Sequence, residues 1–386
     1  MHSASMKPAR PYQICSHCVM DTSDPEITFD AQGVCNHCHA FARASVREWH
    51  PGPEGKVLLE RLVAQIRSDG RGREYDCILG LSGGVDSSFM ALKVKELGLR
   101  PLVMHVDAGW NSELAVSNIE KIVKHCGYEL HTHVMDWSEM RDLQLAYLRA
   151  GVANQDVPQD HAFFASLYHY ATRNGIKTVL SGGNIATEGI FPKAWHGSAM
   201  DAINLRAIHR QYGTIPLKHY QTISFWQYYF WYPLVKRMKV LRPLNYMPYN
   251  KSAAVSELES IGWRPYIGKH GESLFTRFFQ NYWLPTKFGY DKRRPHLSSL
   301  IVSGQLTREA ALRQLEEPLL SRTERDADIT YFCKKLGIAR AEFDTLLGEP
   351  TRHYRDFPNW DRSYARMKKL QGLLQSLTGR KLKAYS

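Results

Sequence analysis

The chain has 386 residues, of which 44% are hydrophobic, and it carries a formal net charge of +12 at pH 7. This length supports a large core and two or three structural units, while the lack of any uncharged apolar run of about 20 residues argues against a membrane span. The positive charge suits a partner that carries phosphate groups, but it does not distinguish nucleic acid, a nucleotide-sugar or a membrane surface.

Two pairs of closely spaced cysteines lie near the N-terminus. Cys15 and Cys18 form one Cys-x-x-Cys motif, and Cys35 and Cys38 form a second after the segment 19–34. In a cytosolic chain, four cysteines at this spacing favour a tetrahedral zinc site over disulfides. A redox role for one pair is the competing interpretation, but it does not require the second pair. Because four cysteines leave no open coordination position, we predict a structural zinc ribbon.

A glycine-rich turn near residue 82 is preceded by an expected strand and followed by an expected helix. Residues 75–81 form a short apolar run, and apolar residues at helical spacing continue from Asp86 to Gly98. The turn, Ser-Gly-Gly-Val-Asp-Ser at 82–87, has two glycines where a side chain would obstruct the chain, and the first amides of the helix can donate to an anion. This pattern predicts a phosphate-binding loop. For Ser-Gly-Gly alone, a tight turn without ligand is the alternative.

Further strands and helices alternate after this loop. We expect strands over 101–107, 129–136, 178–180 and 239–243, and helices over 112–126, 161–173 and 252–261. Repeated β-α-β units require a parallel sheet with right-handed crossovers, and ligands bind at the carboxyl ends of its strands. His105 and Asp107 end the second strand, so we predict that they contact the nucleoside. Capping of the next helix is the alternative role for Asp107.

A second Ser-Gly-Gly follows the expected strand 178–180 and mirrors the first. Gly182 and Gly183 allow the backbone to approach a ligand closely, and the polar segment 185–200 follows them. Glu188 in this segment is a candidate to share Mg²⁺ with Asp86, because Mg²⁺ on phosphates is typically held by one or two carboxylates. Exposure to solvent without any ligand is the alternative for Glu188.

The segment 220–235 is crowded with aromatic residues, and the region from Thr307 onward is helical in pattern. Core packing is the first interpretation of the aromatic segment. A subunit interface and a platform for a sugar or lipid carrier remain the alternatives.

The strand, the loop Ser-Gly-Gly-Val-Asp-Ser and the following helix resemble the pyrophosphate loop of the N-type ATP pyrophosphatases. This group includes asparagine, GMP and NAD synthetases and several tRNA-thiolating enzymes. The resemblance implies an α/β fold with a parallel sheet like that of the adenine nucleotide α-hydrolases, and cleavage of ATP to AMP and pyrophosphate. The implied ATP-binding residues are Ser82, Gly83, Gly84, Asp86, Ser87, His105, Asp107, Gly182 and Gly183, with Mg²⁺ on Asp86.

A block dense in charged, aromatic and hydroxyl residues covers 269–299, including the run Lys-Phe-Gly-Tyr-Asp-Lys-Arg-Arg at 287–294. By composition alone it would be a solvated face. Together with the cysteine motifs and the loop, it resembles the WbpG-type N-acetyl sugar amidotransferases of lipopolysaccharide and O-antigen biosynthesis, over about residues 12–346. The resemblance implies conversion of a sugar N-acetyl group to an acetamidino group, with Ser82, Asp86, Lys292 and Arg293 as candidate catalytic residues.

The same resemblance implies two partners. One is an N-acetyl sugar substrate, linked to a nucleotide or to a lipid. The other is a glutamine amidotransferase pair that supplies ammonia and resembles the subunits of imidazole-glycerol-phosphate synthase, because nothing in this chain looks like a glutaminase. We expect a cytoplasmic protein and leave peripheral association with the inner membrane open.

Three units are expected along the chain. Residues 1–50 hold the leader and zinc ribbon, 51–265 the ATP pyrophosphatase domain, and 266–386 the basic and aromatic substrate segment with a C-terminal helical region. A tRNA-thiolating ATP pyrophosphatase is the alternative function, but that chemistry usually needs a reactive cysteine, and Cys77, Cys126 and Cys333 all lie in expected strands or helices. A nucleic-acid partner is therefore not favoured. A zinc-ribbon adaptor without catalysis is the remaining hypothesis.

Overall fold

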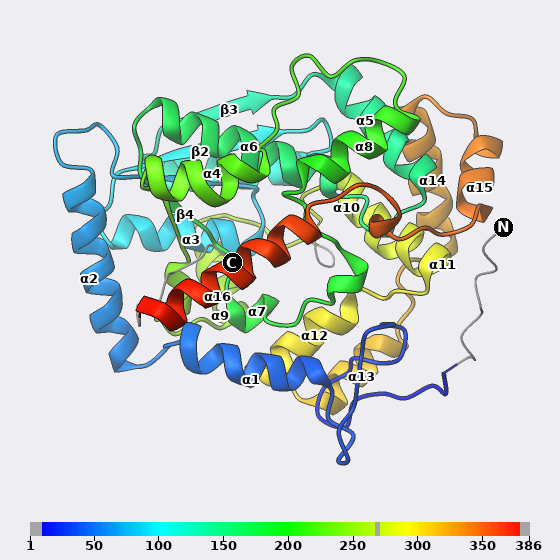
Figure 1. Ribbon diagram of the computed structural model, residues 1–386, viewed down its shortest axis with the longest axis horizontal. Coiled ribbons are helices and arrows are strands. Elements are labelled where there is room, and N and C mark those ends of the chain that lie inside the picture. Colours follow the sequence, from blue (N-terminus) through cyan, green and yellow to red (C-terminus); the bar gives the residue numbers. More distant parts are fainter. Residues whose placement is uncertain (1–9, 267–270, 379–386) are drawn as a thin grey trace.

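The structure is a computed structural model and describes residues 10–266 and 271–378. Its centre is a parallel five-stranded sheet in the order β3-β2-β1-β4-β5, as Figure 1 shows in part. The strands are β1 (Cys77–Gly80), β2 (Pro101–Asp107), β3 (Leu130–Val134), β4 (Thr178–Leu180) and β5 (Lys239–Leu241). The predicted α/β fold with a parallel sheet is confirmed.

The order of the strands reverses at the middle of the sheet. From β1 the chain adds β2 and β3 on one side, and it then returns to add β4 and β5 on the other side. Ile78 and Leu79 of β1 pair with Val179 and Leu180 of β4. The carboxyl ends of β1 and β4 therefore form the switch point where ligands bind in open α/β sheets.

Helices cover both faces of the sheet and form the C-terminal region. The α-helices are α1 (Asn36–Glu48), α2 (Pro53–Asp69), α3 (Val85–Glu96), α4 (Glu113–Cys126), α5 (Trp137–Ala150), α6 (Val157–Arg173), α7 (Ile185–Glu188), α8 (Ala202–Tyr212), α9 (Lys251–Ser260), α10 (Leu274–Phe278), α11 (Leu284–Phe288), α12 (Arg293–Val302), α13 (Arg308–Glu316), α14 (Arg322–Leu336), α15 (Arg340–Gly348) and α16 (Asp361–Thr378). The expected helices over 112–126 and 252–261 agree with α4 and α9 to within a residue or two, and the C-terminal region is helical as expected.

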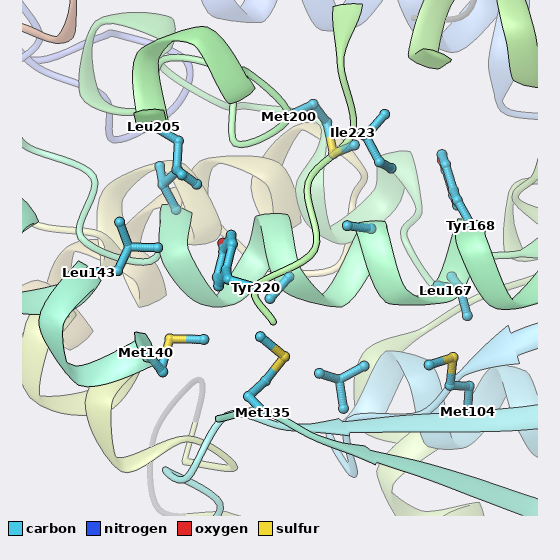
Figure 2. Packing of buried hydrophobic residues seen from close by; sticks show 14 of the residues in the cluster. Met104, Met135, Met140, Leu143, Leu167, Tyr168, Met200, Leu205, Tyr220 and Ile223 are labelled. Atoms are coloured by element: carbon cyan, nitrogen blue, oxygen red, sulfur yellow. The ribbon is translucent and has the colours of Figure 1, made fainter. Parts of the chain in front are cut away.

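Side chains that alternate along β1 fill separate cores on the two faces of the sheet. Ile78 packs with residues of α5, α6 and α8, whereas Cys77 and Leu79 pack with residues of α2, α3, α4 and α9. Figure 2 shows part of the first core, with Met104 and Met135 at the strands and Tyr220 close by. Burial on both faces explains why β1 is apolar throughout rather than alternating.

The aromatic segment 220–235 is divided between core and surface. Tyr220 and Tyr232 are buried, but the side chains of Trp226 and Trp231 are 69% and 46% exposed. Core packing thus accounts for only part of the segment, and its role as an interface or platform stays a prediction. Within residues 10–266 and 271–378, no helix combines the length and the apolar character that a membrane crossing requires.

The predicted unit boundaries near residues 50 and 265 stay predictions, and contacts cross both of them. The N-terminal cysteine unit packs against Ile190 and Trp195 in the segment after β4. Tyr266 donates a hydrogen bond to the carbonyl of Gly83 across the second boundary. In Figure 1 the N-terminal unit, drawn in blue, lies beside α12 and α13.

Candidate functional site

The loop 82–87 connects β1 to α3, and its own hydroxyl groups hold its shape. The Oγ atoms of Ser82 and Ser87 lie 3.1 Å apart, and the amide of Gly84 donates to Ser82 Oγ over 3.3 Å. Gly83 has a φ of +86°, in the left-handed region that glycine adopts without strain. The loop therefore presents hydroxyls and the first amides of α3 at the switch point, which is an arrangement suited to an anion.

The second Ser-Gly-Gly turn packs directly on the first. A Cβ atom on Gly182 would lie only 2.7 Å from the backbone oxygen of Asp86 and 3.0 Å from the nitrogen of Ser87. The sequence predicted close backbone approach to a ligand at this point. In the structure, Gly182 allows the ends of β1 and β4 to come together, while Gly183 has only the side-chain oxygens of Ser181 and Glu188 near it.

Two side chains that the sequence analysis missed hold the carboxylate of Asp86. Tyr249 donates its hydroxyl proton to Asp86 Oδ1, and Asn184 Nδ2 donates to the same oxygen over 3.4 Å. Burial raises the pKa of Tyr249, and the charges of Asp86 and Glu188 raise that pKa further. Asp86 and Glu188 therefore both lie close to the Tyr249 hydroxyl. Two carboxylates beside the predicted phosphate-binding loop fit the oxygen ligands that Mg²⁺ prefers.

His105 and Asp107 stabilise the end of the sheet. His105 is buried, its Nδ1 lies 2.9 Å from the carbonyl oxygen of Leu81, and its Nε2 lies 2.9 Å from Asn111 Nδ2. Burial lowers the pKa of His105, which favours the neutral ring. Asp107 accepts from the amide of Gly109 over 2.8 Å, so it caps a turn, while Ser112 caps α4. Their predicted contact with the nucleoside stays a prediction.

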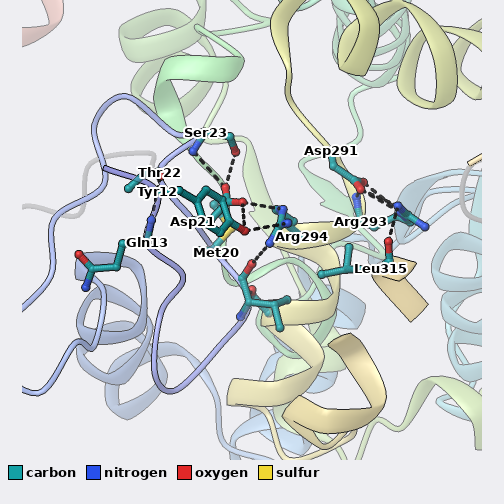
Figure 3. Close-up of polar contacts among 12 residues, drawn as sticks. Tyr12, Gln13, Met20, Asp21, Thr22, Ser23, Asp291, Arg293, Arg294 and Leu315 are labelled. Atoms are coloured by element: carbon teal, nitrogen blue, oxygen red, sulfur yellow. Dashed lines mark hydrogen bonds and ion pairs between the residues drawn. The ribbon is translucent and has the colours of Figure 1, made fainter. Parts of the chain in front are cut away.

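The three consecutive basic residues 292–294 reach three different parts of the molecule. Lys292 Nζ lies 2.8 Å from His196 Nε2, in the segment after β4, and 5.1 Å from the centre of the Phe191 ring. Arg294 pairs with Asp21 in the N-terminal unit, as Figure 3 shows. Only Lys292 therefore points toward the segment that carries Glu188.

Arg293 makes its contacts around the start of α12 and the end of α13. Its guanidinium binds both carboxylate oxygens of Asp291 and donates to the carbonyl of Leu315, as Figure 3 shows. It also donates to the carbonyls of Gln314 and Glu317. These contacts occupy the guanidinium in joining the start of α12 to the end of α13. The predicted contact of Arg293 with phosphate or substrate stays a prediction.

Asp160 is a candidate residue that the sequence analysis missed. Its side chain reaches solvent, yet the crowding of protein atoms around it, the charge of Asp156 and that of Glu188 raise its pKa to about 8, and Lys292 opposes this shift. Lys292, Asp160 and Glu188 therefore share one neighbourhood. The only sequence signal was an aspartate in the first turn of α6, which is common in helices without function.

Glu272 brings a further carboxylate to the phosphate-binding loop. The amide of Ser112 donates to the carbonyl of Glu272 over 2.9 Å, and a Cβ atom on Gly84 would lie 3.2 Å from Glu272 Oε1. A carboxylate at this position is compatible with a bound phosphate when a cation lies between them. Glu272 thus joins Asp86 and Glu188 as a candidate Mg²⁺ ligand. The nearby Lys269 and His270 of the predicted basic block lie outside the described residues.

The four cysteines of the N-terminal unit form a tight cluster. The Sγ distances are 3.9 Å for Cys15 and Cys38, 3.7 Å for Cys18 and Cys35, and 3.6 Å for Cys35 and Cys38. Four thiolates at zinc–sulfur distances of about 2.3 Å from one ion would lie ~3.8 Å apart in a tetrahedron. The cluster therefore fits the predicted structural zinc.

This cysteine cluster supports the segment that follows β4. Its core includes Ile190 and Trp195, and the ring of Trp195 stacks on Tyr290 with centroids 4.6 Å apart. The amide of Ile190 donates to Ser299 Oγ of α12, and Arg308 of α13 donates to the carbonyls of Cys15 and Cys18. The N-terminal unit and the helices α12 and α13 thus hold the segment between Glu188 and His196 from outside.

The helices α12 and α13 belong to a part of the chain that is similar to a known protein family. Residues 272–371 match the family model for the C-terminal domain of WbpG-like LPS biosynthesis proteins. Residues 272–371, which are similar to this family, are called the WbpG-like domain below. The resemblance to WbpG-type proteins is confirmed by this match, which includes Glu272, Lys292, Ser299 and Arg308. A search of curated proteins found no match.

Solved structures similar to the chain include two synthetases. One is the NH3-dependent NAD synthetase from Campylobacter jejuni, with 14% identity, a TM-score of 0.27, and coverage of 41% of this chain and 72% of that chain. The other is NMN synthetase from Francisella tularensis, with 14% identity, a TM-score of 0.36, and coverage of 69% and 98%. Similarity at this level does not bear on the function. Of these comparisons, the match of residues 272–371 to the WbpG-like family model is therefore the one that bears on the function.

Proposed function

We propose that the protein is an ATP-dependent amidotransferase that converts the N-acetyl group of a surface-glycan sugar precursor into an acetamidino group. One observation carries this proposal: Glu188 links the turn 181–183, which packs on the loop 82–87, to the neighbourhood of Lys292. A Cβ atom on Gly183 would lie 3.4 Å from Glu188 Oε2, and the charges of Glu188 and Lys292 both act on the pKa of Asp160.

The proposed reaction has two steps. In the first, the oxygen of the acetamido group attacks the α-phosphorus of ATP, a carbon–oxygen–phosphorus link forms, and pyrophosphate leaves with the electrons of the broken phosphoanhydride bond. In the second, ammonia adds to the activated carbon and the carbon–oxygen bond breaks. AMP carries away the former amide oxygen, and the new nitrogen loses a proton.

Different residues bind the phosphates, neutralise their charge and accept a proton in this reaction. Ser82, Ser87 and the first amides of α3 hold phosphate oxygens, and Lys292 neutralises charge that develops on them. Mg²⁺, when bound by Asp86 with Glu188 or Glu272, supplies further neutralisation of the phosphates. Asp160, which shares its neighbourhood with Lys292 and Glu188, is the candidate acceptor for the proton that the incoming nitrogen loses, and its pKa of about 8 lies near the working pH of most enzymes.

Ammonia comes from a second protein in this proposal. The three cysteines outside the N-terminal cluster, Cys77, Cys126 and Cys333, are buried, and burial raises the pKa of each thiol. A buried, protonated thiol is a poor nucleophile, so none of them suits a glutaminase. A glutamine amidotransferase pair resembling the imidazole-glycerol-phosphate synthase subunits remains the proposed source. The same burial disfavours tRNA thiolation.

The test supplies ammonium directly and follows AMP. Purified protein is incubated with ATP, Mg²⁺, ammonium and either a panel of nucleotide-linked N-acetyl sugars or bulk tRNA. We expect sugar-dependent AMP and a sugar product whose mass has changed by the replacement of one oxygen with NH. AMP formation that depends on tRNA and a sulfur donor would instead establish the thiolation alternative.

A further inference from the structure

A cavity of about 350 Å³ lies beside the candidate site. Its walls come from three parts of the chain: residues between the end of α5 and the start of α6, the segment 194–204, and residues 288–290 and 351–356 of the WbpG-like domain. This volume is near the lower end of the ~300–1,000 Å³ that small-molecule sites occupy, so it suits a single sugar ring better than a lipid chain.

The chemistry of the walls combines flat aromatic rings with short polar groups. Tyr290 and Tyr354 bring partly exposed aromatic rings to the cavity, and the buried ring of Trp195 stacks on Tyr290 with an angle of 8° between the two rings. Asn204 and Asp201 line the same space. Ring faces pack on the C–H surface of a sugar, while amide and carboxylate groups bind its hydroxyls. An apolar surface with a few convergent polar groups is typical of small-molecule sites.

Two buried donors in these walls have no hydrogen-bond partner among the described protein atoms. They are the hydroxyl of Tyr147 and Nε1 of Trp195, and both side chains are 1% exposed. Buried polar groups are nearly always paired, so these two donors are exceptions in the protein wall around the cavity, although neither atom is exposed to the cavity itself.

The cavity is connected to the candidate catalytic residues through its own lining. His196 lines the cavity, and its Nε2 lies 2.8 Å from Lys292 Nζ. Val157 also lines it, and Asp160 follows one helical turn later on the same side of α6. A sugar in the cavity would therefore have its substituents near Lys292 and Asp160.

We propose that this cavity binds the ring of the N-acetylated sugar, an inference that rests on the function proposed above. The WbpG-like domain supplies one wall through Tyr290 and Tyr354, so this domain would determine which sugar is accepted. The segment 194–204 supplies another wall, so the cysteine unit that supports Trp195 also fixes the shape of the sugar site.

The test narrows the cavity without touching the phosphate-binding loop. Thr351 lines the cavity and is exposed, and Thr351→Trp would fill part of the space. Ser198→Trp would also fill part of the cavity, from the segment 194–204. Thr330→Trp, at an exposed position of α14 that does not line the cavity, is the matched control. For each protein, KM for the active sugar of the nucleotide-linked panel and KM for ATP are measured through AMP release.

We expect both cavity variants to raise KM for the sugar by ~10-fold or more, with KM for ATP changed less than ~2-fold, and the control to match the wild type. If the wild-type enzyme is active and both cavity variants fold but keep its KM for the sugar, the cavity assignment is overturned and the proposed function stays intact. A wild-type protein that forms no AMP with any sugar of the panel would overturn the proposed function, and the cavity assignment with it.

Discussion

Asp86 lies in the first turn of α3, and its Oδ1 accepts hydrogen bonds from the side chains of Tyr249 and Asn184. Both donors come from segments far along the chain and fix the carboxylate at the phosphate-binding loop. Its neighbours therefore position Asp86 before any ligand arrives, which is the arrangement that catalysis by charge neutralisation requires.

We expect Asp86→Ala to abolish AMP formation in a protein that remains folded. The substitution leaves the buried hydroxyl of Tyr249 without its acceptor, so the free energy of unfolding should fall by about 1–3 kcal/mol. Asp86→Asn retains an acceptor oxygen and should restore most of this stability without restoring activity. AMP release and thermal unfolding measure the two effects. Normal turnover by folded Asp86→Ala would refute the magnesium role.

Asp160 gives a prediction on pH dependence. Because its pKa is about 8 in the folded protein, the carboxyl group is mainly protonated below that pH and cannot accept a proton. At a constant concentration of free ammonia, the rate should rise as pH increases through about 8 and then level off. Asp160→Asn should lower the rate by about 100-fold and remove this rise. An unchanged pH profile in Asp160→Asn would exclude Asp160 as the proton acceptor.

The same pKa shift has a consequence for stability. The pKa of an aspartate is about 3.9 in the unfolded chain, so the ionised form of Asp160 is less favourable in the folded state. Its contribution to folding is therefore lost as pH rises from about 4 to about 8. Relative to the wild type, Asp160→Asn should gain stability over that range, as urea unfolding at several pH values would show.

Pairing between strands determines where the candidate site residues lie. The helix α3 starts at the end of β1, and the turn 181–183 starts at the end of β4, so pairing of these strands brings the two turns together. Contact between them depends on the missing side chain of Gly182, since Asp86 and Ser87 leave no room for a Cβ atom.

We expect Gly182→Ala to destabilise the protein and to raise KM for ATP. Its Cβ would meet backbone atoms at 2.7–3.0 Å, and because backbone cannot rotate away as a side chain can, the phosphate-binding loop must shift. Overpacking of this kind costs about 1–3 kcal/mol. Gly183→Ala is the matched control, because its Cβ would meet only side-chain atoms at 3.3–3.4 Å. Equal effects of the two substitutions on thermal unfolding would contradict this explanation.

Helix α5 was not predicted from the sequence, and its buried polar residues explain why. Glu139, Asp142 and Gln144 are buried in it, so its apolar pattern is interrupted by polar residues. The Glu139 carboxylate accepts from the backbone amides of Lys218, His219 and Tyr220, and Asp142 accepts from those of Thr214 and Ile215. These partners are more than 70 residues away, and helical periodicity does not register such contacts.

At the scale of the whole molecule, the N-terminal cysteine unit and the WbpG-like domain support the site from outside. Arg294 and Arg308 join α12 and α13 to the cysteine unit, which in turn packs on Ile190 and Trp195. Metal binding at the four cysteines should therefore influence a segment that contributes both Lys292's partner His196 and the wall of the cavity.

We expect Cys35→Ser to lose zinc, to loosen residues 10–50 and to alter the environment of Trp195. Zinc content by atomic absorption, proteolysis of the N-terminal unit and tryptophan fluorescence measure these effects. Cys126→Ser, which removes a buried thiol of α4 outside the cluster, is the control and should retain one zinc. One full equivalent of zinc in Cys35→Ser would contradict the four-cysteine site.

Local patterns in the sequence were sufficient for the parallel sheet and for the cluster of four cysteines, because each depends on residues close together in the chain. Phosphate binding by the loop 82–87 stays a prediction. The order of β-α-β units implied parallel strands, and the spacing of Cys15, Cys18, Cys35 and Cys38 implied four converging thiols. The block 269–299, taken together with the cysteine motifs and the loop, indicated the resemblance to WbpG-type proteins, which the match over residues 272–371 confirms.

Long-range packing decided the rest. Lys292 and Arg293 are adjacent and chemically similar, yet only Lys292 reaches the segment after β4, because the helix start directs neighbouring side chains to different partners. Asp160, Tyr249 and Glu272 gave no signal, since their positions depend on contacts between segments distant in sequence. The cavity likewise has walls from separate segments. Burial and charge at the site are properties of this assembly, so only the tertiary structure could assign them.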